Sequence, residues 1–394
     1  MHVKKVRVGI VGAGFIAKIH MAAFKENYQL VDVVGVCAGH KENAERFAKE
    51  YGIPHVFDNF EQLCSSPEID VVDVCTPTNL HDDVILCAAE NRKHVICEKP
   101  LTGYFGEDKP DVEEVGSIPK THMYDKVKEK VTLLEQKLKT ANVKFMYAEN
   151  WVYAPAVEKM KRMLKASNMV VFELRAECSH SGSQATYSRR WRTSGGGSLM
   201  RLGSHPIATV IHMKHYEGYA RDGKPIKPVS VLASVANLTK MKSLENEPCY
   251  VVSSWYDVED WSIVILEFED GSRATVFSTD VSLGGVKNRL ELYGSKGMIV
   301  ANITPNSAMV AFAPNETVWG DEYISEKLET KAGYTFPSPD EFWTRGYPQE
   351  MKDFAMAVLE DRTVLSGFDL AKDTMLVMYA AYVSAELGKK VLIQ

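Results

Sequence analysis

Up to about residue 150, apolar runs of strand length alternate with segments of helical pattern. The apolar runs predict strands at residues 6–11, 30–37, 71–76, 94–98 and 144–149. The segments between them predict helices at residues 16–25, 41–51, 60–65, 82–91 and 126–141. Apolar strands separated by helices are typical of a parallel sheet that is covered on both faces. The pattern therefore predicts an α/β fold with a parallel sheet over residues 1–150.

The segment 103–121 interrupts this alternation. It is acidic and rich in turn residues, namely Gly106, Pro110, Gly116 and Pro119. Loops of this length in a compact domain are usually functional or mobile. We therefore expect an insertion, either a solvated surface excursion or a lid or subunit-contact arm.

Beyond residue 150, strand patterns follow one another without helices between them. Helices are predicted at residues 153–165, 349–361 and 369–388. Strands are predicted at residues 170–178, 229–238, 253–256, 263–268, 273–282, 289–294 and 298–302, with hairpin signals at 269–272 and 294–297. This pattern predicts an α+β domain over residues 151–394 with an open, largely antiparallel sheet. We expect the last two helices to pack back on the first domain, and the exposed sheet face to form a homo-oligomer, a dimer or tetramer.

Composition narrows the functional classes. The 394 residues carry a formal charge of −6 with a pI near 6.0, which provides no basic field for nucleic acid or an anionic membrane. No apolar run approaches the ~20 residues that span a bilayer, and the first residues lead into a strand rather than a signal peptide. The seven cysteines are scattered without C-x-x-C pairing, as expected of buried thiols in a reducing cytoplasm. We therefore expect a cytoplasmic protein that acts on a small molecule.

The most informative short motif is Gly-x-Gly-x-x-Ala at residues 12–17, directly after the first predicted strand. Gly12 lets the strand turn sharply, Gly14 lets backbone N–H groups approach a pyrophosphate, and the small third residue lets the helix pack on the strand. The helix amino terminus, at Phe15 and Ile16, then presents unpaired N–H groups to the phosphates. This order of strand, glycines and helix predicts a dinucleotide-binding Rossmann domain.

The choice of cofactor depends on the end of the second predicted strand. An acidic residue there, about twenty residues beyond the glycines, favours NAD, and an arginine favours NADP. This chain has Ala38, Gly39, His40 and Lys41 instead, which matches neither signature. We expect NAD, with NADP as the alternative through His40 and Lys41.

Further motifs follow along the chain in a characteristic order. They are Cys-Thr-Pro-Thr-Asn-Leu-His (75–81), Glu-Lys-Pro-Leu (98–101), Trp-Arg-Thr-Ser-Gly-Gly-Gly-Ser-Leu (191–199), Gly-Ser-His (203–205) and Met-Tyr-Ala-Ala-Tyr-Val-Ser-Ala (378–385). With the glycine motif, they make the chain resemble the glucose–fructose oxidoreductase, inositol dehydrogenase and rhizopine-catabolism family (Gfo/Idh/MocA). The resemblance covers nearly the whole chain apart from segments 103–121, 214–228 and 303–345. It implies a Rossmann domain and an open-faced α/β domain, with the nicotinamide in the cleft between them.

Lys99 is the first candidate for catalysis. It follows the carboxyl end of a predicted parallel strand, where ligands bind in open α/β sheets. An amine there could hydrogen-bond a substrate hydroxyl or take its proton as hydride leaves. The resemblance places the family's active-site lysine in this Glu-Lys-Pro motif, with Glu98 orienting Lys99 or the nicotinamide ribose. A surface lysine beside a turn proline is the alternative.

The loop after the third predicted strand is expected beside the cofactor. By the resemblance, Thr76, Pro77, Asn79 and His81 flank the cofactor there. His81 has an alternative role as the cap of the helix that follows.

His205 is the second candidate, because its imidazole could exchange a proton with the reacting hydroxyl. The family commonly has an aspartate four residues before this histidine and another acidic residue three after it. This chain has Arg201 and Ala208 there. The change removes the carboxylate expected to raise the basicity of His205, and it supplies a donor fork suited to sugar hydroxyls or an anionic group. It argues against inositol as the substrate, and it leaves a structural role for His205 as the alternative.

Other candidates lie around these two. The resemblance places Trp191 and Arg192 beside the nicotinamide. Asn150 and Tyr153 lie at the expected domain junction, where Asn150 would contact the cofactor and Tyr153 would assist catalysis.

His180 and Arg189 are candidate substrate contacts, because polar side chains at the rim of a pocket suit a carbohydrate. A structural role is the alternative for both. The spacing of Cys178, His180 and His205 matches no compact metal motif, so no metal is expected.

Together, these residues predict an oxidoreductase that transfers hydride between NAD and a ring carbon bearing a secondary hydroxyl, C3 of a sugar or glycoside being one expected position. Lys99 would bind and deprotonate the hydroxyl, with His205 or Tyr153 assisting. One alternative is a redox-initiated glycosidase, in which C3 oxidation acidifies the C2 proton, elimination expels the C1 substituent, and the bound cofactor returns its hydride. Another is a non-catalytic cofactor-binding scaffold or sensor.

Overall fold

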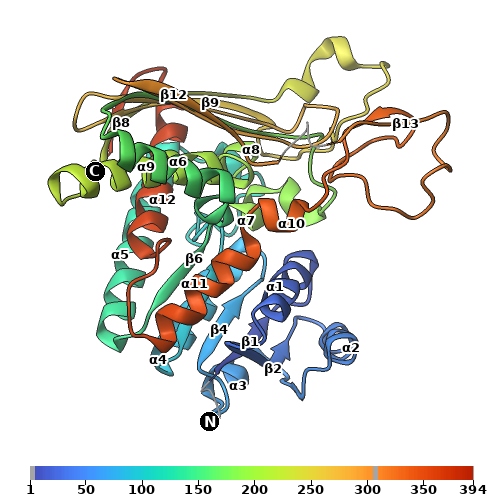
Figure 1. Ribbon diagram of the computed structural model, residues 1–394, viewed down its shortest axis with the longest axis vertical. Helices are drawn as coiled ribbons and strands as arrows, with labels where there is room; N and C mark the ends of the chain where they lie inside the picture. Colours follow the sequence, from blue (N-terminus) through green and yellow to red (C-terminus); the bar gives the residue numbers. More distant parts are fainter. Residues whose placement is uncertain (1–4, 305–308, 394) are drawn as a thin grey trace.

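The computed structural model describes residues 5–304 and 309–393, and two sheets organise them (Figure 1). The first sheet has six parallel strands in the order β3-β2-β1-β4-β5-β6. They are β1 (Val6–Val11), β2 (Val31–Cys37), β3 (His55–Val56), β4 (Val71–Val74), β5 (His94–Glu98) and β6 (Phe145–Ala148). The order reverses at β1 and β4, and ligands of open α/β sheets bind outside the carboxyl ends of strands at such a point. The expected Rossmann sheet is confirmed.

Helices connect these strands and bury their apolar residues against the sheet. They are α1 (Phe15–Glu26), α2 (Lys41–Tyr51), α3 (Phe60–Ser65), α4 (His81–Glu90) and α5 (Lys120–Ala141), with the 3-10 turns η1 (Thr78–Leu80) and η2 (Val115–Ser117). Ala17 and Phe24 of α1 and Leu134 of α5 are buried in the common core. The sheet itself is apolar and buried along most of its length, as expected for strands covered by helices.

The second sheet has seven strands in the order β12-β11-β7-β10-β9-β8-β15. They are β7 (Val171–Ser179), β8 (Pro228–Ala236), β9 (Trp261–Phe268), β10 (Arg273–Thr279), β11 (Lys287–Gly294), β12 (Gly297–Asn302) and β15 (Val391–Leu392). Only β7 and β10 pair in parallel within this sheet; its other pairs are antiparallel. The expected open, largely antiparallel sheet is therefore confirmed.

The strand predicted at residues 253–256 is wrong. Backbone groups before it and at its end bond outside any strand, with Val252 N–H donating to Ser181 O and Tyr256 N–H to Arg189 O. Trp255 is buried in this segment, against the guanidinium of Arg201. Its apolar pattern thus reflects packing between loops.

Helices α6 (Pro155–Ser167) and α9 (Ser204–Asp222) lie beneath the second sheet, with the short helices α7 (Trp191–Ser194) and α8 (Ser198–Arg201) and the 3-10 turns η3 (Asn150–Tyr153) and η4 (Thr186–Arg189) (Figure 1). Helix α9 has no counterpart among the predicted elements. Its first eleven residues except His205 are buried, so it lacks the one-sided apolar pattern of a surface helix.

The carboxyl-terminal segment returns to the first sheet. Helices α11 (Tyr347–Leu359) and α12 (Phe368–Leu387) pack on α1 and α5, respectively, and α10 (Glu341–Thr344) precedes them (Figure 1). The hairpin of β13 (Ala311–Ala313) and β14 (Gly333–Thr335) projects to one side, and the turns η5 (Leu238–Lys240) and η6 (Lys242–Leu244) follow β8. Among the helices described, none is long and apolar enough to cross a membrane.

The segment 103–121, which we call the strap, is docked between the two halves of the chain. Tyr104, Phe105 and Val115 are buried within it. Arg192 donates to carbonyl groups of the strap, and Gly116 N–H donates to Asp257 Oδ2 over 3.0 Å. These contacts favour a fixed structural element over a solvated excursion or a lid.

Candidate active site

The glycine loop has the geometry that a pyrophosphate requires. Gly12 has φ +112°, and a Cβ there would lie 2.5 Å from the carbonyl oxygen of Cys75. A Cβ on Gly14 would meet nothing within 4 Å, so the space before α1 is open. Helix α1 begins without a side-chain cap and without an acidic residue in its first turn. Its free N–H groups therefore suit phosphate, with Phe15 exposed and Ile16 half-buried beside them.

The end of β2 leaves room for an unphosphorylated ribose. Ala38 and Gly39 follow the strand, and a Cβ on Gly39 would meet nothing within 4 Å. The Lys41 ammonium lies 2.6 Å from Asp58 Oδ1, so its charge is already paired. A ribose 2′-phosphate would meet that carboxylate, whereas a 2′-hydroxyl would not be repelled. These residues fit NAD, with His40 exposed at the edge of the site.

Lys99 extends from the carboxyl end of β5 toward the second half of the chain. Its Nζ donates to the carbonyl oxygen of Arg201 over 3.0 Å. Its backbone N–H donates to Glu98 Oε2, also over 3.0 Å. The ammonium is thus positioned by a backbone carbonyl and has no carboxylate within ion-pair distance among the described residues.

His205 is paired with a carboxylate after all. Its Nδ1 lies 2.7 Å from Oε1 of Glu149, the buried residue that follows β6. The ring stacks on Trp151 with centroids 5.5 Å apart and planes 7° from parallel. The expectation that Arg201 leaves His205 without an acidic partner is therefore wrong, because the carboxylate comes from a distant strand end.

The surroundings of His205 keep the imidazole neutral but oriented. Burial lowers its pKa, the charge of Lys99 lowers it further, and Glu149 opposes both. A carboxylate only accepts, so Nδ1 carries the proton and Nε2 keeps its lone pair. The pair therefore provides a proton acceptor at Nε2 whose cationic form Glu149 would stabilise.

Arg201 is committed to the protein rather than to a ligand. Its guanidinium forms a two-pronged ion pair with buried Asp280 and lies 4.5 Å over the ring of Trp255. The expected role of Arg201 as a donor to substrate is contradicted, because both terminal nitrogens of its guanidinium are bonded to Asp280. Arg201 still serves the site through its carbonyl oxygen, which holds Lys99.

His180 is a fixed donor. Its Nδ1 accepts the backbone N–H of Gly182 over 2.9 Å, so the proton lies on Nε2. Burial and then the charges of Arg201 and Lys327 lower its pKa to about 3. The ring therefore stays neutral at physiological pH and can donate but not act as a base.

Lys327 is a neighbour of the site that sequence reasoning missed. Its Nζ donates to Gly182 O over 3.0 Å, next to His180, and its φ is +59°. Glu326, the residue before it, pairs with Arg345. All three residues belong to segment 303–345, whose lack of family resemblance left no motif to signal them.

Four further candidate side chains form hydrogen bonds with other groups of the protein. The Tyr153 hydroxyl donates to Asp353 and accepts from Ser366 N–H within the buried core, which contradicts a catalytic role. Asn150 Nδ2 donates to Arg345 O and is also buried. Trp191 Nε1 donates to Tyr104 O, and Arg192 binds carbonyl groups of the strap. These bonds join both side chains to the strap.

The loop after β4 is joined to the loop after β5 by His81. Its Nδ1 lies 3.0 Å from Pro100 O and its Nε2 3.1 Å from Thr76 O. Burial lowers the pKa of this imidazole. His81 thus holds the two loops together rather than capping α4 with its side chain. Thr76, Pro77 and Asn79 are half-buried at this edge of the sheet, where a cofactor would lie.

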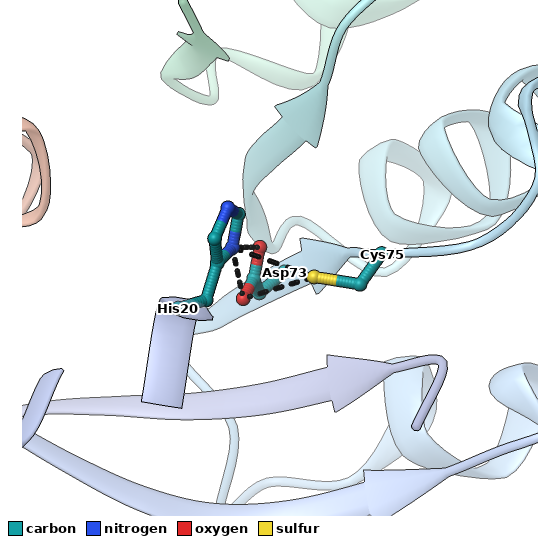
Figure 2. Close-up of side chains that lie close together, drawn as sticks. All are labelled: His20, Asp73 and Cys75. Carbon is teal, nitrogen blue, oxygen red and sulfur yellow. Dashed lines mark hydrogen bonds and ion pairs between the residues drawn. The ribbon is translucent and has the colours of Figure 1, made fainter. Parts of the chain in front are cut away.

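A second buried cluster lies beneath the glycine loop, and Figure 2 shows three of its members. His20 Nδ1 lies 3.0 Å from both carboxylate oxygens of Asp73 and 3.4 Å from Cys75 Sγ. These groups are close enough to hold a metal ion. Burial, with Asp73 nearby, raises the pKa of the Cys75 thiol to about 12, which favours hydrogen bonding over metal ligation.

Comparison with known proteins supports the arrangement. Residues 6–115 match the model of the Gfo/Idh/MocA oxidoreductase family with an NAD-binding Rossmann fold, and residues 158–300 match its carboxyl-terminal domain. Levoglucosan dehydrogenase of Pseudarthrobacter phenanthrenivorans is 26% identical over 79% of this chain and 78% of its own. Myo-inositol 2-dehydrogenase of Thermotoga maritima is 24% identical over 98% of both chains.

Among solved structures, GenD2 from gentamicin A biosynthesis, in complex with NAD, superposes with a TM-score of 0.80. It is 22% identical to this chain, and the match covers 100% of this chain and 98% of GenD2. The likeness extends the fold assignment over both sheets. The chain therefore belongs to the Gfo/Idh/MocA oxidoreductase family, and its first sheet forms an NAD-binding Rossmann domain.

Proposed function

We propose that this protein is an NAD-dependent dehydrogenase that oxidises a secondary hydroxyl of a sugar or glycoside. The observation that carries the proposal is the pairing of Lys99 with a neutral, carboxylate-bound His205. Lys99 follows the carboxyl end of β5, and His205, on α9, is held by Glu149, which follows β6. The charge of Lys99 acts on the imidazole of His205. Full-length similarity to dehydrogenases of levoglucosan and myo-inositol supports a carbohydrate as the substrate.

The residues divide the work of hydroxyl oxidation between them. NAD supplies the hydride acceptor, and the free N–H groups at the start of α1 would hold its phosphates. Lys99 Nζ donates to the substrate oxygen and stabilises negative charge there. His205 Nε2 takes the hydroxyl proton, and Glu149 stabilises the resulting imidazolium through Nδ1–H. Hydride and proton thus leave the same alcohol by separate routes.

The outer part of the site would form hydrogen bonds with the rest of the substrate. His180 Nε2–H is a neutral donor, and Lys327 lies beside it. Arg189 is half-buried with its Nε hydrogen bond unmade among the described residues. These donors suit the oxygens of a sugar, and C3 is one position that we propose for the oxidation.

We also propose a homo-oligomer that forms through the open face of the second sheet. Leu232 of β8 and Ile265 of β9 lie opposite each other on that face, and each is about 40% exposed. In Figure 1 helices α6, α9 and α12 lie on the other side of this sheet. All seven cysteines are free, which agrees with the cytoplasm as the compartment.

The test is a panel of sugars, glycosides and polyols, offered with NAD and separately with NADP, with reduced nicotinamide measured by absorbance. We expect turnover of at least one sugar or glycoside with NAD. Lys99→Met should abolish it while leaving NADH binding intact, because the glycine loop is untouched. Light scattering on the same sample gives the number of subunits.

Two outcomes would overturn the proposal. Absence of turnover across the panel by folded, NADH-binding protein would favour a scaffold or sensor. Release of the C1 substituent without added cofactor would instead assign the site to a redox-initiated glycosidase.

A further inference from the structure

His20 is buried in α1 and is held between two carboxylates from neighbouring strands. Its Nδ1 lies 3.0 Å from both oxygens of Asp73 on β4, and its Nε2 lies 3.0 Å from Oε1 of Glu98 on β5. All three side chains are nearly inaccessible to solvent. A carboxylate only accepts hydrogen bonds, so both ring nitrogens act as donors and the ring is an imidazolium.

The charges around His20 agree with this form. Burial opposes the cation, but the Asp73 carboxylate outweighs it and holds the pKa of His20 well above its ordinary value. Burial likewise opposes ionisation of Glu98, and the bond to His20 outweighs it and lowers the pKa of that carboxyl.

Helix α11 contributes one more group to this pocket, Glu350. Its carboxyl is fully buried, and neither of its oxygens has a partner among the described residues. Burial raises its pKa well above the usual range, which makes it a neutral acid. His20 is thus the cation that lies between the carboxylates of Asp73 and Glu98, and it offsets one of their two negative charges.

The cluster also connects the cofactor helix to the reacting centre. His20 lies on α1, the helix whose amino terminus would face the cofactor phosphates. Glu98 uses one oxygen for His20 and the other for the backbone N–H of Lys99, 3.0 Å away. We propose that the buried His20 imidazolium is a positioning residue, which holds the Glu98–Lys99 turn against the cofactor helix and sets the charge felt by the proton acceptor. This role rests on the dehydrogenase function proposed above.

The sign of the electrostatic effect follows from the charges. Removal of a buried positive charge strengthens proton binding by every group nearby, and removal of a negative charge weakens it. In the proposed site, the groups that would face the reacting hydroxyl are Lys99, directly after β5, and His205, on α9, with Glu149, Cys178 and His180 around them. Oxidation needs an unprotonated acceptor, so the pH at which activity rises should follow the charge of the His20 cluster.

The test is a charge cycle at positions 20 and 73. His20→Gln keeps a donor but removes the cation, so the rise of kcat/KM with pH should move up by about one unit. Asp73→Asn removes an anion and should move it down. The double variant H20Q/D73N restores the net charge and should return the profile close to that of the unchanged protein. Asp32→Asn, at an exposed carboxylate on β2, is the matched control and should shift nothing.

Two results would overturn the proposal. In the first, the variants lose activity but the pH dependence of kcat/KM stays where it is. In the second, the pH dependence of H20Q/D73N is shifted as far as that of H20Q. If H20Q fails to fold, the pH profile of D73N alone tests the proposal: a downward shift supports it, and an unchanged profile contradicts it.

A second readout does not depend on turnover. Protein labelled with 15N-histidine should show one ring with both nitrogens protonated at neutral pH and above, and this signal should vanish in H20Q. Its absence would exclude the imidazolium, whereas its presence in a protein without turnover would count against the dehydrogenase function only.

Discussion

His180 is buried and His205 is half-buried, and the charge of Lys99 acts on both, yet the structure gives them opposite chemistry. The Nδ1 atom of His205 faces the carboxylate of Glu149, whereas Nδ1 of His180 faces the backbone N–H of Gly182. The first contact puts the proton on Nδ1 and leaves Nε2 as an acceptor. The second puts the proton on Nε2 and makes it a donor. The partner of the inner nitrogen thus decides what the outer nitrogen can do.

The largest expected effect follows from removing the acceptor. His205→Gln cannot take the hydroxyl proton, so kcat should fall by about 10²–10⁴-fold, the usual range for a general base. The Kd for NADH, measured by fluorescence, should stay the same because the glycine loop is unaltered. A variant that keeps activity within a few-fold would remove His205 from the mechanism.

Removing only the partner should have a smaller effect. Glu149→Gln can still orient the ring but cannot stabilise the imidazolium, so kcat should fall by roughly 10–10³-fold. Burial already lowers the pKa of His205, and Glu149 opposes that shift. Without the carboxylate the pKa falls further, so the acid limb of the pH–rate profile should move to lower pH. Since the two groups act as a unit, H205Q/E149Q should be no slower than H205Q alone.

The smallest kinetic effect is expected at His180. His180→Gln keeps a donor, so KM should rise by no more than about tenfold while kcat changes little. The pH–rate profile should not move, because burial holds the pKa of His180 at about 3. A shift in that profile would contradict the assignment of His205 as the proton acceptor and His180 as a neutral donor.

The same variant has a signature in stability. A histidine whose folded pKa is about 3 stays neutral while the unfolded chain takes up a proton below its ordinary value of 6.5. Stability contributed by the neutral ring is therefore complete above that value and is lost as the pH falls toward 3. H180Q should flatten this loss, by at most about 1.4 kcal/mol per pH unit, as measured by denaturant unfolding at several pH values.

The parts of the molecule that were predictable are those in which function and fold depend on neighbours in sequence. Gly12 and Gly14 adjoin the strand and helix that they connect, and Lys99 follows its strand directly. The regular alternation of apolar runs likewise indicated both sheets. Helix α9 was missed because burial on nearly all sides erases the periodic signal by which helices are recognised.

The site residues that were missed or misjudged depend on contacts between distant segments. Glu149 meets His205 across 56 positions, and Arg201 meets Asp280 across 79. Lys327 reaches the site from a segment without a motif, and Arg192 is bound by the strap. Spacing along the chain carries no information about such pairs.

The sequence alone therefore determined the glycine loop, the lysine after β5 and the order of the two domains, because each follows from local backbone geometry and hydrophobic periodicity. Only the tertiary structure decided that His205 accepts a proton, that Arg201 is paired with Asp280 and that a histidine lies between two buried carboxylates. The physical reason is that protonation and pairing depend on burial and on the nearest charged group, and here those groups come from strands and loops far apart in the chain.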